Sequence, residues 1–118
     1  MEKVYLDSAA TTQMRPEVIT KITEVMQENY GNPSSTHSFG RSAKSLIERA
    51  RKTIAKQLNV TAAEIIFTSG GTEADNLALN SAVRDLGVRR IITSEIEHHA
   101  VLYCVNQLKD CFDIEVEY

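Results

Sequence analysis

The chain has 118 residues, of which 42% are hydrophobic and 25% are charged, and its formal net charge is -3. These values are typical of a globular protein with one modest core, and the acidic balance argues against a nucleic-acid surface. No apolar run approaches the roughly 18 residues of a transmembrane helix, and we expect no signal peptide. Two cysteines, Cys104 and Cys111, are too few for a disulfide scaffold. We therefore expect a cytoplasmic protein without nucleic-acid or membrane partners.

The first half of the chain is predicted to be mostly helical. Pro16 suits the first turn of a helix that Gly31 ends. The apolar face of this helix comprises Val18, Ile19, Ile22, Val25 and Met26. Turn formers dominate 31–37, which is therefore predicted to be a loop. A second helix is predicted over 41–58, and its apolar stripe comprises Ala43, Leu46, Ile47, Ala50 and Ile54.

The segment 61–68 is predicted to form a capped turn and then a strand. Thr61 and Glu64 have the spacing of a capping box. The apolar run 65–68 follows at once and is typical of a buried strand. Only one helical turn is therefore expected at Thr61.

Strands and helices alternate in the rest of the chain. The sequence predicts a helix over 73–86 ended by Gly87, a strand over 90–93, a helix from His98 or His99 to about Leu108, and a strand over 114–118. The inward face of the later helix comprises Ala100, Val101, Cys104, Val105 and Leu108. This alternation predicts an α/β fold with a mostly parallel sheet flanked by helices. Because the last strand reaches the last residue, we expect an incomplete domain.

The turn Ser69-Gly70-Gly71-Thr72 is the strongest candidate for a ligand site. Two glycines allow a sharp turn and a close approach of a ligand to the backbone. The following helix directs its free N–H groups and the positive end of its dipole at the turn, and Thr72 adds a hydroxyl donor. A phosphate fits this description. The residues alone equally allow a plain turn between strand and helix, in which Thr72 only caps the helix.

A pair of histidines, His98 and His99, follows the strand predicted over 90–93. Ligands of open parallel sheets bind at the carboxyl ends of the strands, so this pair should lie near the same edge as Gly71 and Thr72. A histidine there could stack on a flat heteroaromatic ring or transfer protons. The alternative is a helix start at which the histidines are incidental. Adjacent helical histidines point apart, and we expect no metal site.

Four motifs occur in order along the chain: Tyr5-Leu6-Asp7-Ser8-Ala9-Ala10-Thr11-Thr12, Gly31-Asn32-Pro33-Ser34-Ser35-Thr36-His37, Phe67-Thr68-Ser69-Gly70-Gly71-Thr72-Glu73-Ala74-Asp75-Asn76 and Glu97-His98-His99-Ala100-Val101-Leu102. The chain thereby resembles, over essentially its whole length, the N-terminal part of the cysteine desulfurases of the nitrogen-fixation and iron–sulfur-cluster type. These enzymes belong to the class V aminotransferase group, with the fold-type I large domain and pyridoxal phosphate as cofactor. The resemblance implies an N-terminal helical segment over 1–60 and the start of the cofactor-binding α/β domain over 61–118. Ser8 and Gln13 depart from the residues common in the family.

The resemblance also implies roles for individual residues. Gly71 and Thr72 would bind the cofactor phosphate, and His98 would stack on the pyridine ring and act in catalysis by proton transfer. Asn32 and the segment 9–12 resemble stretches near the mouth of the active site.

The family converts L-cysteine to L-alanine, with the sulfur passing through an enzyme persulfide to an acceptor scaffold protein for iron–sulfur cluster assembly. It acts as a homodimer. The lysine that binds the cofactor, the aspartate at the pyridine nitrogen, the nucleophilic cysteine and the arginine that binds the substrate carboxylate all lie, in the family, beyond the matched part. We therefore expect this chain alone to be inactive, and we expect Cys104 to be a buried, inert thiol.

Three alternatives stay open from the sequence: a non-catalytic truncated remnant, one half of a split enzyme, and an aminotransferase or selenocysteine lyase relative. The family's sheet order predicts that the strand over 65–68 lacks its neighbours here. The isolated chain is therefore expected to be unstable, rearranged or assembled with another chain. His37 is expected to brace its loop rather than to take part in chemistry.

Overall fold

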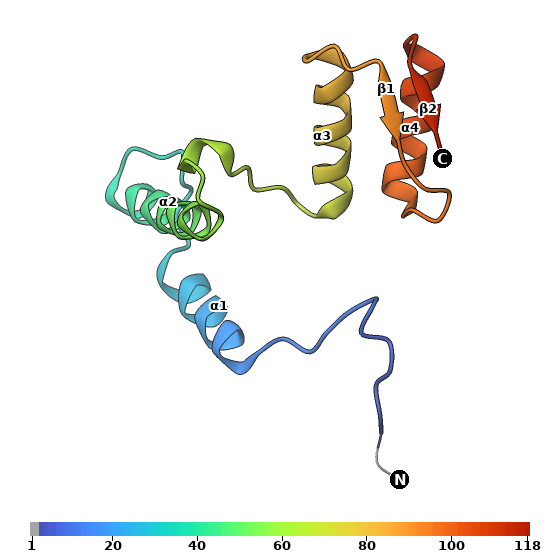
Figure 1. The fold of residues 1–118 in the computed structure, drawn as a ribbon. Helices are drawn as coiled ribbons and strands as arrows, with labels where there is room; N and C mark the ends of the chain where they lie inside the picture. The colour runs from blue at the N-terminus through green and yellow to red at the C-terminus, as the bar shows by residue number, and fades with distance from the viewer. Residues whose placement is uncertain (1–2) are drawn as a thin grey trace. The chain divides into compact units, whose positions relative to one another are not determined.

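The computed structural model describes residues 3–118, which divide into two compact units, one up to Ile65 and one over Ile66–Tyr118. The first unit contains α1 (Pro16–Glu28), α2 (Ser38–Leu58) and the 3-10 turn η1 (Ala62–Glu64). The second contains α3 (Gly71–Arg84), β1 (Arg90–Ile92), α4 (His99–Cys111) and β2 (Glu115–Glu117) (Figure 1). The domain division at residue 60 that the resemblance implies stays a prediction.

Helix α1 begins at Pro16, as predicted, but ends at Glu28, before Gly31. Asn29 is its C-cap, and the Asn29 N–H donates to Val25 O at 2.8 Å. No residue of α1 is buried, and Ile19 is 51% exposed. The apolar periodicity therefore predicted the helix correctly, while its apolar face is exposed apart from Val25, which is half-buried.

Helix α2 begins at Ser38, three residues before the predicted start, because His37 caps it. The Nδ1 atom of His37 accepts the N–H of Gly40 at 3.4 Å. A neutral ring nitrogen thus satisfies one of the N–H groups that the first helical turn leaves free. The bracing role predicted for His37 matches this geometry.

The loop before α2 is closed on itself. Asn32 Oδ1 accepts the Ser34 N–H at 2.9 Å, and the Asn32 carbonyl accepts the Ser35 N–H at 3.0 Å. The loop also packs tightly on the helix, because a Cβ placed on Gly40 would lie 2.3 Å from the Ser35 carbonyl oxygen. Gly40 is therefore required by close approach of two backbones.

Of the five residues in the predicted stripe of α2, Ala43 is the buried one, and Ala55 adds a second buried alanine. The helix ends at Leu58, and Asn59 takes the left-handed conformation with φ of 55°. The single turn predicted at Thr61 is confirmed as η1. Its capping box is complete, since the Thr61 N–H donates to Glu64 Oε2 at 2.8 Å.

The buried strand that the apolar run predicts over 65–68 is wrong for this chain, while the lack of strand neighbours expected from the family's sheet order agrees with the structure. These residues form irregular backbone, and Ile66 and Phe67 are 66% and 46% exposed. Among the described residues the sheet consists of β1 and β2 alone. A short apolar run becomes a buried strand only when strands pair with it and helices cover both faces.

The second unit confirms the α/β prediction. Strands β1 and β2 pair in parallel, with Arg90 opposite Glu115 and Ile92 opposite Glu117. Helices α3 and α4 lie side by side next to this sheet (Figure 1). The core between these elements is formed by Val83, Cys104, Leu108 and Ile114. Helix α4 buries the predicted positions apart from Val101, which is half-buried, and extends to Cys111.

Helix α3 begins at Gly71, two residues before the predicted start, with Gly70 as its N-cap. It ends at Arg84, and Gly87 follows with φ of +71°. This left-handed conformation strains any residue with a Cβ, which explains the glycine. The helix ends two residues before the predicted end at 86, and Gly87 lies in the segment that follows it.

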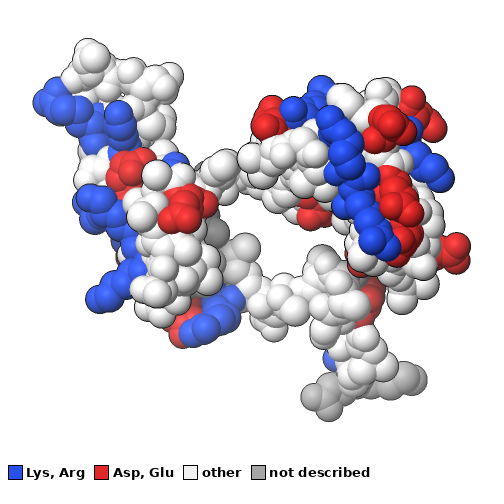
Figure 2. All heavy atoms as spheres, turned by 45° about the horizontal axis from the view of Figure 1, so that its top comes forward, with Lys and Arg blue, Asp and Glu red and all other residues white. Residues whose placement is uncertain are grey.

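Charged side chains of both signs are interspersed on the face shown in Figure 2. On the sheet edge, Arg90 pairs with Glu117 and lies 3.7 Å from a carboxylate oxygen of Glu115. Over residues 3–118 no helix has the length and apolar character needed to span a membrane.

Candidate functional site

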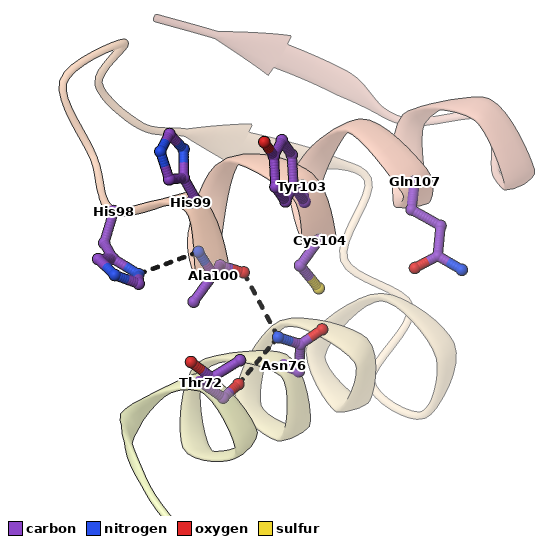
Figure 3. A pocket seen from close by; sticks show the side chains of 8 residues that line it. All are labelled: Thr72, Asn76, His98, His99, Ala100, Tyr103, Cys104 and Gln107. Carbon is purple, nitrogen blue, oxygen red and sulfur yellow. Dashed lines mark hydrogen bonds between the residues drawn. The ribbon is translucent and has the colours of Figure 1, made fainter.

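A cavity of about 290 Å³ lies between the first half of α3 and α4, along α4 as far as Gln107 (Figure 3). This volume is near the lower end of the range for small-molecule sites. Its lining comprises Thr72, Asn76, His98, His99, Ala100, Tyr103, Cys104 and Gln107. The structure thus brings together Thr72 and His98, two of the three residues predicted to bind a cofactor.

The start of α3 is open to a ligand. The first helical bond runs from the Ala74 N–H to Gly70 O at 3.2 Å, so the N–H groups of residues 71–73 precede it. A Cβ placed on Gly70 or Gly71 would meet no atom within 4 Å. Gly70 has an extended φ of 171°, which any residue adopts. The backbone conformation therefore does not require Gly70, and free space above the turn is what the glycines provide.

Glu73 closes the other side of the turn, a feature that the sequence prediction missed. Its Oε2 accepts both the N–H and the Oγ–H of Ser69, each at 2.7 Å. These two bonds hold the pKa of the Glu73 carboxyl below its ordinary value, and the bond from the Ser69 backbone N–H has the larger effect. Since the donors of Ser69 are engaged, the backbone N–H groups near Thr72 and the Thr72 hydroxyl remain for an anion.

His98 is the N-cap of α4 and faces the cavity. Its Nδ1 accepts the Ala100 N–H at 3.1 Å. A neutral imidazole that accepts at Nδ1 carries its proton at Nε2. The capping bond therefore fixes both the ring and its tautomer, and it leaves Nε2 as the atom for proton transfer. Capping and chemistry, alternatives on the sequence, are compatible in the structure.

His99 takes a different position from its neighbour. Its ring stacks on that of Tyr103, with centroids 5.3 Å apart and planes 11° from parallel. Both rings line the cavity, on the α4 side (Figure 3). The rings of His98 and His99 lie with centroids 6.0 Å apart and planes 49° from parallel, so the expected divergence does not occur. The reason is that His98 is the N-cap, in extended backbone, rather than a helical residue. Within the described part of the chain, no group of three histidine, cysteine or acidic side chains is placed to hold a metal ion.

Asn76 joins the two sides of the cavity and was not predicted as a site residue. Its Nδ2 donates to Thr72 O at 2.8 Å and to Ala100 O at 3.4 Å (Figure 3). One helical turn further, Asn80 Nδ2 donates to Asn76 O at 2.9 Å and to Cys104 Sγ at 3.3 Å. The spacing of four residues between the asparagines is the available sequence signal, because it places both on one helix face.

Cys104 is 2% exposed, which confirms the predicted buried thiol. Burial raises the pKa of this thiol, so it stays protonated and inert near neutral pH. Cys111 is exposed at the end of α4. Asn32 and the segment 9–12 belong to the first unit, and their place near an active-site mouth stays a prediction.

The fit of the site to pyridoxal phosphate rests on three features. Unbonded N–H groups at a helix start and the Thr72 hydroxyl suit a phosphate. The imidazole of His98 offers a flat face at the same cavity. The open space over Gly70 and Gly71 admits a ligand to the backbone. The residues present therefore suit a phosphorylated heteroaromatic ligand.

The fold defines an α/β protein in which the start of α3 offers N–H groups that suit an anion. Residues 4–118 match the profile of "Aminotransferase class-V", and the chain belongs to this family. It is 52% identical over 109 residues to the "IscS-like cysteine desulfurase" of Mycobacterium tuberculosis, covering 88% of this chain and 28% of the relative. It is also 52% identical over 82 residues to the "Selenocysteine lyase" of Rattus norvegicus, covering 70% of this chain and 19% of that protein.

A solved structure named "NIFS-LIKE PROTEIN" superposes on this chain with a TM-score of 0.89 and 38% sequence identity. The superposition covers 99% of this chain and 32% of the solved chain. The chain therefore spans about a third or less of the length of these relatives. These likenesses confirm the family resemblance and the partial α/β fold.

Proposed function

We propose that the chain forms the phosphate- and ring-binding part of a pyridoxal-phosphate-dependent cysteine desulfurase. The observation that carries the proposal is the cavity that joins the start of α3, at Thr72, to His98 at the start of α4. The class V family and the names of the relatives support this choice of cofactor and reaction.

In this proposal, the N–H groups at Gly71 and Thr72 and the Thr72 hydroxyl bind the cofactor phosphate. Pyridoxal phosphate, when bound, supplies an electron sink for reactions at the α-carbon and β-carbon of amino acids. The helix dipole of α3 adds favourable charge at the phosphate. Charge-assisted bonds from backbone donors would make this end the main anchor.

His98 holds the ring of the cofactor and moves a proton at Nε2. Its Nδ1 is engaged by the Ala100 N–H, so the ring cannot turn without losing its cap. A neutral imidazole with one free nitrogen is suited to stacking and to proton transfer near neutral pH. His98 is therefore the proposed catalytic residue of this chain.

For the whole protein we propose the conversion of L-cysteine to L-alanine in a cytoplasmic homodimer. Its sulfur would pass to an acceptor scaffold protein for iron–sulfur cluster assembly. This activity requires the cofactor lysine and the nucleophilic cysteine that the family carries outside the matched third. The full chain assayed alone is accordingly expected to release no sulfide from cysteine.

A selenocysteine lyase is the second candidate, since the rat relative of that name is as similar over its matched part. The two functions differ in the substrate and share the cofactor site. An assay of the protein together with its remaining family segments, offered L-cysteine or L-selenocysteine, separates them. Sulfide release from cysteine is the result that our proposal predicts.

Binding of pyridoxal phosphate to the full chain tests the proposed cofactor role. We expect saturable binding, weakened about ten-fold or more by T72V, because a hydrogen bond to a charged group contributes about 1.5–3 kcal/mol. H98A should weaken binding of pyridoxal phosphate and leave that of inorganic phosphate unchanged. T53V is the matched control, since Thr53 lies on α2 and its hydroxyl donates to Arg49 O. Equal affinities of T72V, H98A and T53V would contradict the proposal.

A further inference from the structure

The asparagines Asn76 and Asn80 form a repeated polar seam between α3 and α4. Each side-chain amide donates back to the carbonyl four residues earlier on α3, and each also donates across to α4. The two acceptors on α4, Ala100 O and Cys104 Sγ, are themselves four residues apart. Each asparagine therefore contacts α4 at the same relative position, one turn apart.

The two asparagines differ in the groups that accept their hydrogen bonds. Asn76 donates to the carbonyls of Thr72 and Ala100, and the Ala100 N–H in turn donates to Nδ1 of His98, the N-cap of α4. Asn80 bonds to the backbone of Asn76 and to the buried thiol of Cys104. Asn76 lines the cavity, whereas Asn80 lies one turn further into the helix pair. Two residues with the same side chain therefore differ in position, since Asn76 lines the cavity and Asn80 does not.

We infer that Asn76 is a positioning residue that fixes His98 relative to Thr72, an inference that deepens the proposed function. Its Nδ2 has two hydrogens and donates to one backbone carbonyl in the first turn of α3 and one in the first turn of α4. One amide group therefore spans the phosphate-binding and ring-binding sides of the cavity. Without it, the start of α4 loses its bond to α3, and His98 shifts relative to Thr72.

The inference separates two kinds of ligand. Inorganic phosphate needs the start of α3 alone, while pyridoxal phosphate needs Thr72 and His98 at a fixed separation. Loss of the Asn76 bonds should therefore weaken binding of pyridoxal phosphate and leave binding of phosphate nearly unchanged. A loss of overall stability would instead weaken the binding of both ligands.

The experiment compares N76L with N80L in the full chain, since leucine is close to asparagine in size and donates no hydrogen bond. N76A and N80A form a second pair, which keeps the comparison interpretable if the leucine variants fold poorly. Binding of pyridoxal phosphate and of inorganic phosphate is measured by titration, each with and without H98A. In the free proteins, the ¹⁵N shifts of the His98 ring report whether Nδ1 still accepts a hydrogen bond.

We expect H98A to weaken pyridoxal phosphate binding about ten-fold in the native and N80L backgrounds and less than about two-fold in N76L, because coupling is lost when the link is removed. The His98 ring signals should move in N76L and N76A and stay in place in N80L and N80A. Equal behaviour of the Asn76 and Asn80 variants would overturn the inference. If the native chain binds no pyridoxal phosphate, the proposed function fails, while the ring signals in the free proteins still test the role of Asn76.

Discussion

The two units of this chain contrast in how much of their apolar surface they bury. Over residues 3–65, the buried hydrophobic residues are Ala43 and Ala55, although two amphipathic helices are present. Beyond it, Val83, Ala100, Cys104, Val105, Leu108 and Ile114 are buried in a unit of fewer residues. Amphipathic periodicity therefore forms helices in both units, while a core of larger side chains forms only where the sheet and two helices meet.

This contrast matters for function because the candidate site lies within the second unit. The cavity is held by α3 and α4, whose packing rests on Val83, Cys104 and Leu108. The first unit contributes a tightly closed loop and its helix cap, which are local structures stabilised by hydrogen bonds between near neighbours. Stability and ligand binding should accordingly respond to changes in the second unit far more than to changes in the first.

The largest expected effect comes from truncating the core. Leu108 is 1% exposed, so L108A removes buried methyl groups and should cost about 2–5 kcal/mol of unfolding free energy. The matched change I19A, on the exposed face of α1, should stay within about 0.5 kcal/mol. Urea unfolding of the full chain measures both. Similar losses for the two variants would show that α1 is covered in solution.

The next effect separates two glycines of the second unit. G87A places a Cβ on a residue with φ of +71° and should destabilise the fold by about 1–2 kcal/mol. G70A lies in extended backbone with open space around it, so the fold should tolerate it. Thermal unfolding compares them, and titration with inorganic phosphate should show a loss of affinity for G70A. A destabilised G70A would contradict the view that this glycine serves ligand access.

A smaller effect is expected from the capping box of the first unit. T61A removes the hydroxyl that donates to Glu64 and should cost about 1 kcal/mol of unfolding free energy. V60A, at the preceding residue, is the control for a change outside the cap. Circular dichroism during thermal unfolding reports the loss. No difference between T61A and V60A would mean that η1 is not part of the cooperative unit.

The smallest effect concerns pH. Bonds from Ser69 lower the pKa of the Glu73 carboxyl, so its stabilising contribution is present above the ordinary carboxyl pKa. It is lost as the pH falls through the lowered pKa of the folded state, since the protonated carboxyl accepts these bonds poorly. Carboxyl ¹³C shifts followed through an acid titration measure this pKa. S69A removes the hydroxyl donor and keeps the backbone donor, so it should move this pKa part of the way back up. An unchanged titration in S69A would remove the Ser69 hydroxyl as a cause.

Local signals predicted the helices and turns well. Pro16 marked the start of α1, and the spacing of Thr61 and Glu64 gave the single capped turn, because each of these signals acts within one turn of backbone. The parallel pairing of β1 and β2 also followed from the alternation of strands and helices. His98 at the start of α4 was likewise placed near Thr72 from the edge rule for parallel sheets.

Features that depend on distant partners were predicted poorly. The run 65–68 has the composition of a buried strand, but burial and pairing need other strands, which composition does not report. The bond of Asn76 to Ala100 depends on the distance between α3 and α4, while the bonds of Glu73 to Ser69 are local and depend on the rotamer of the Glu73 side chain. Both residues stand in the motif that carried the family resemblance. The spacing of Asn76 and Asn80 was the one sequence signal for Asn76, and Glu73 had no comparable signal.

The central claim is that Thr72 and His98 bind one ligand across the cavity. Two-dimensional NMR of the full chain, with increasing pyridoxal phosphate and with pyridoxal as the ligand without phosphate, tests it most directly. The account predicts that the Thr72 amide and the His98 ring signals shift together along one binding curve with pyridoxal phosphate, and that pyridoxal binds more weakly. Shifts confined to lysines scattered over the surface, with Thr72 and His98 unchanged, would contradict it.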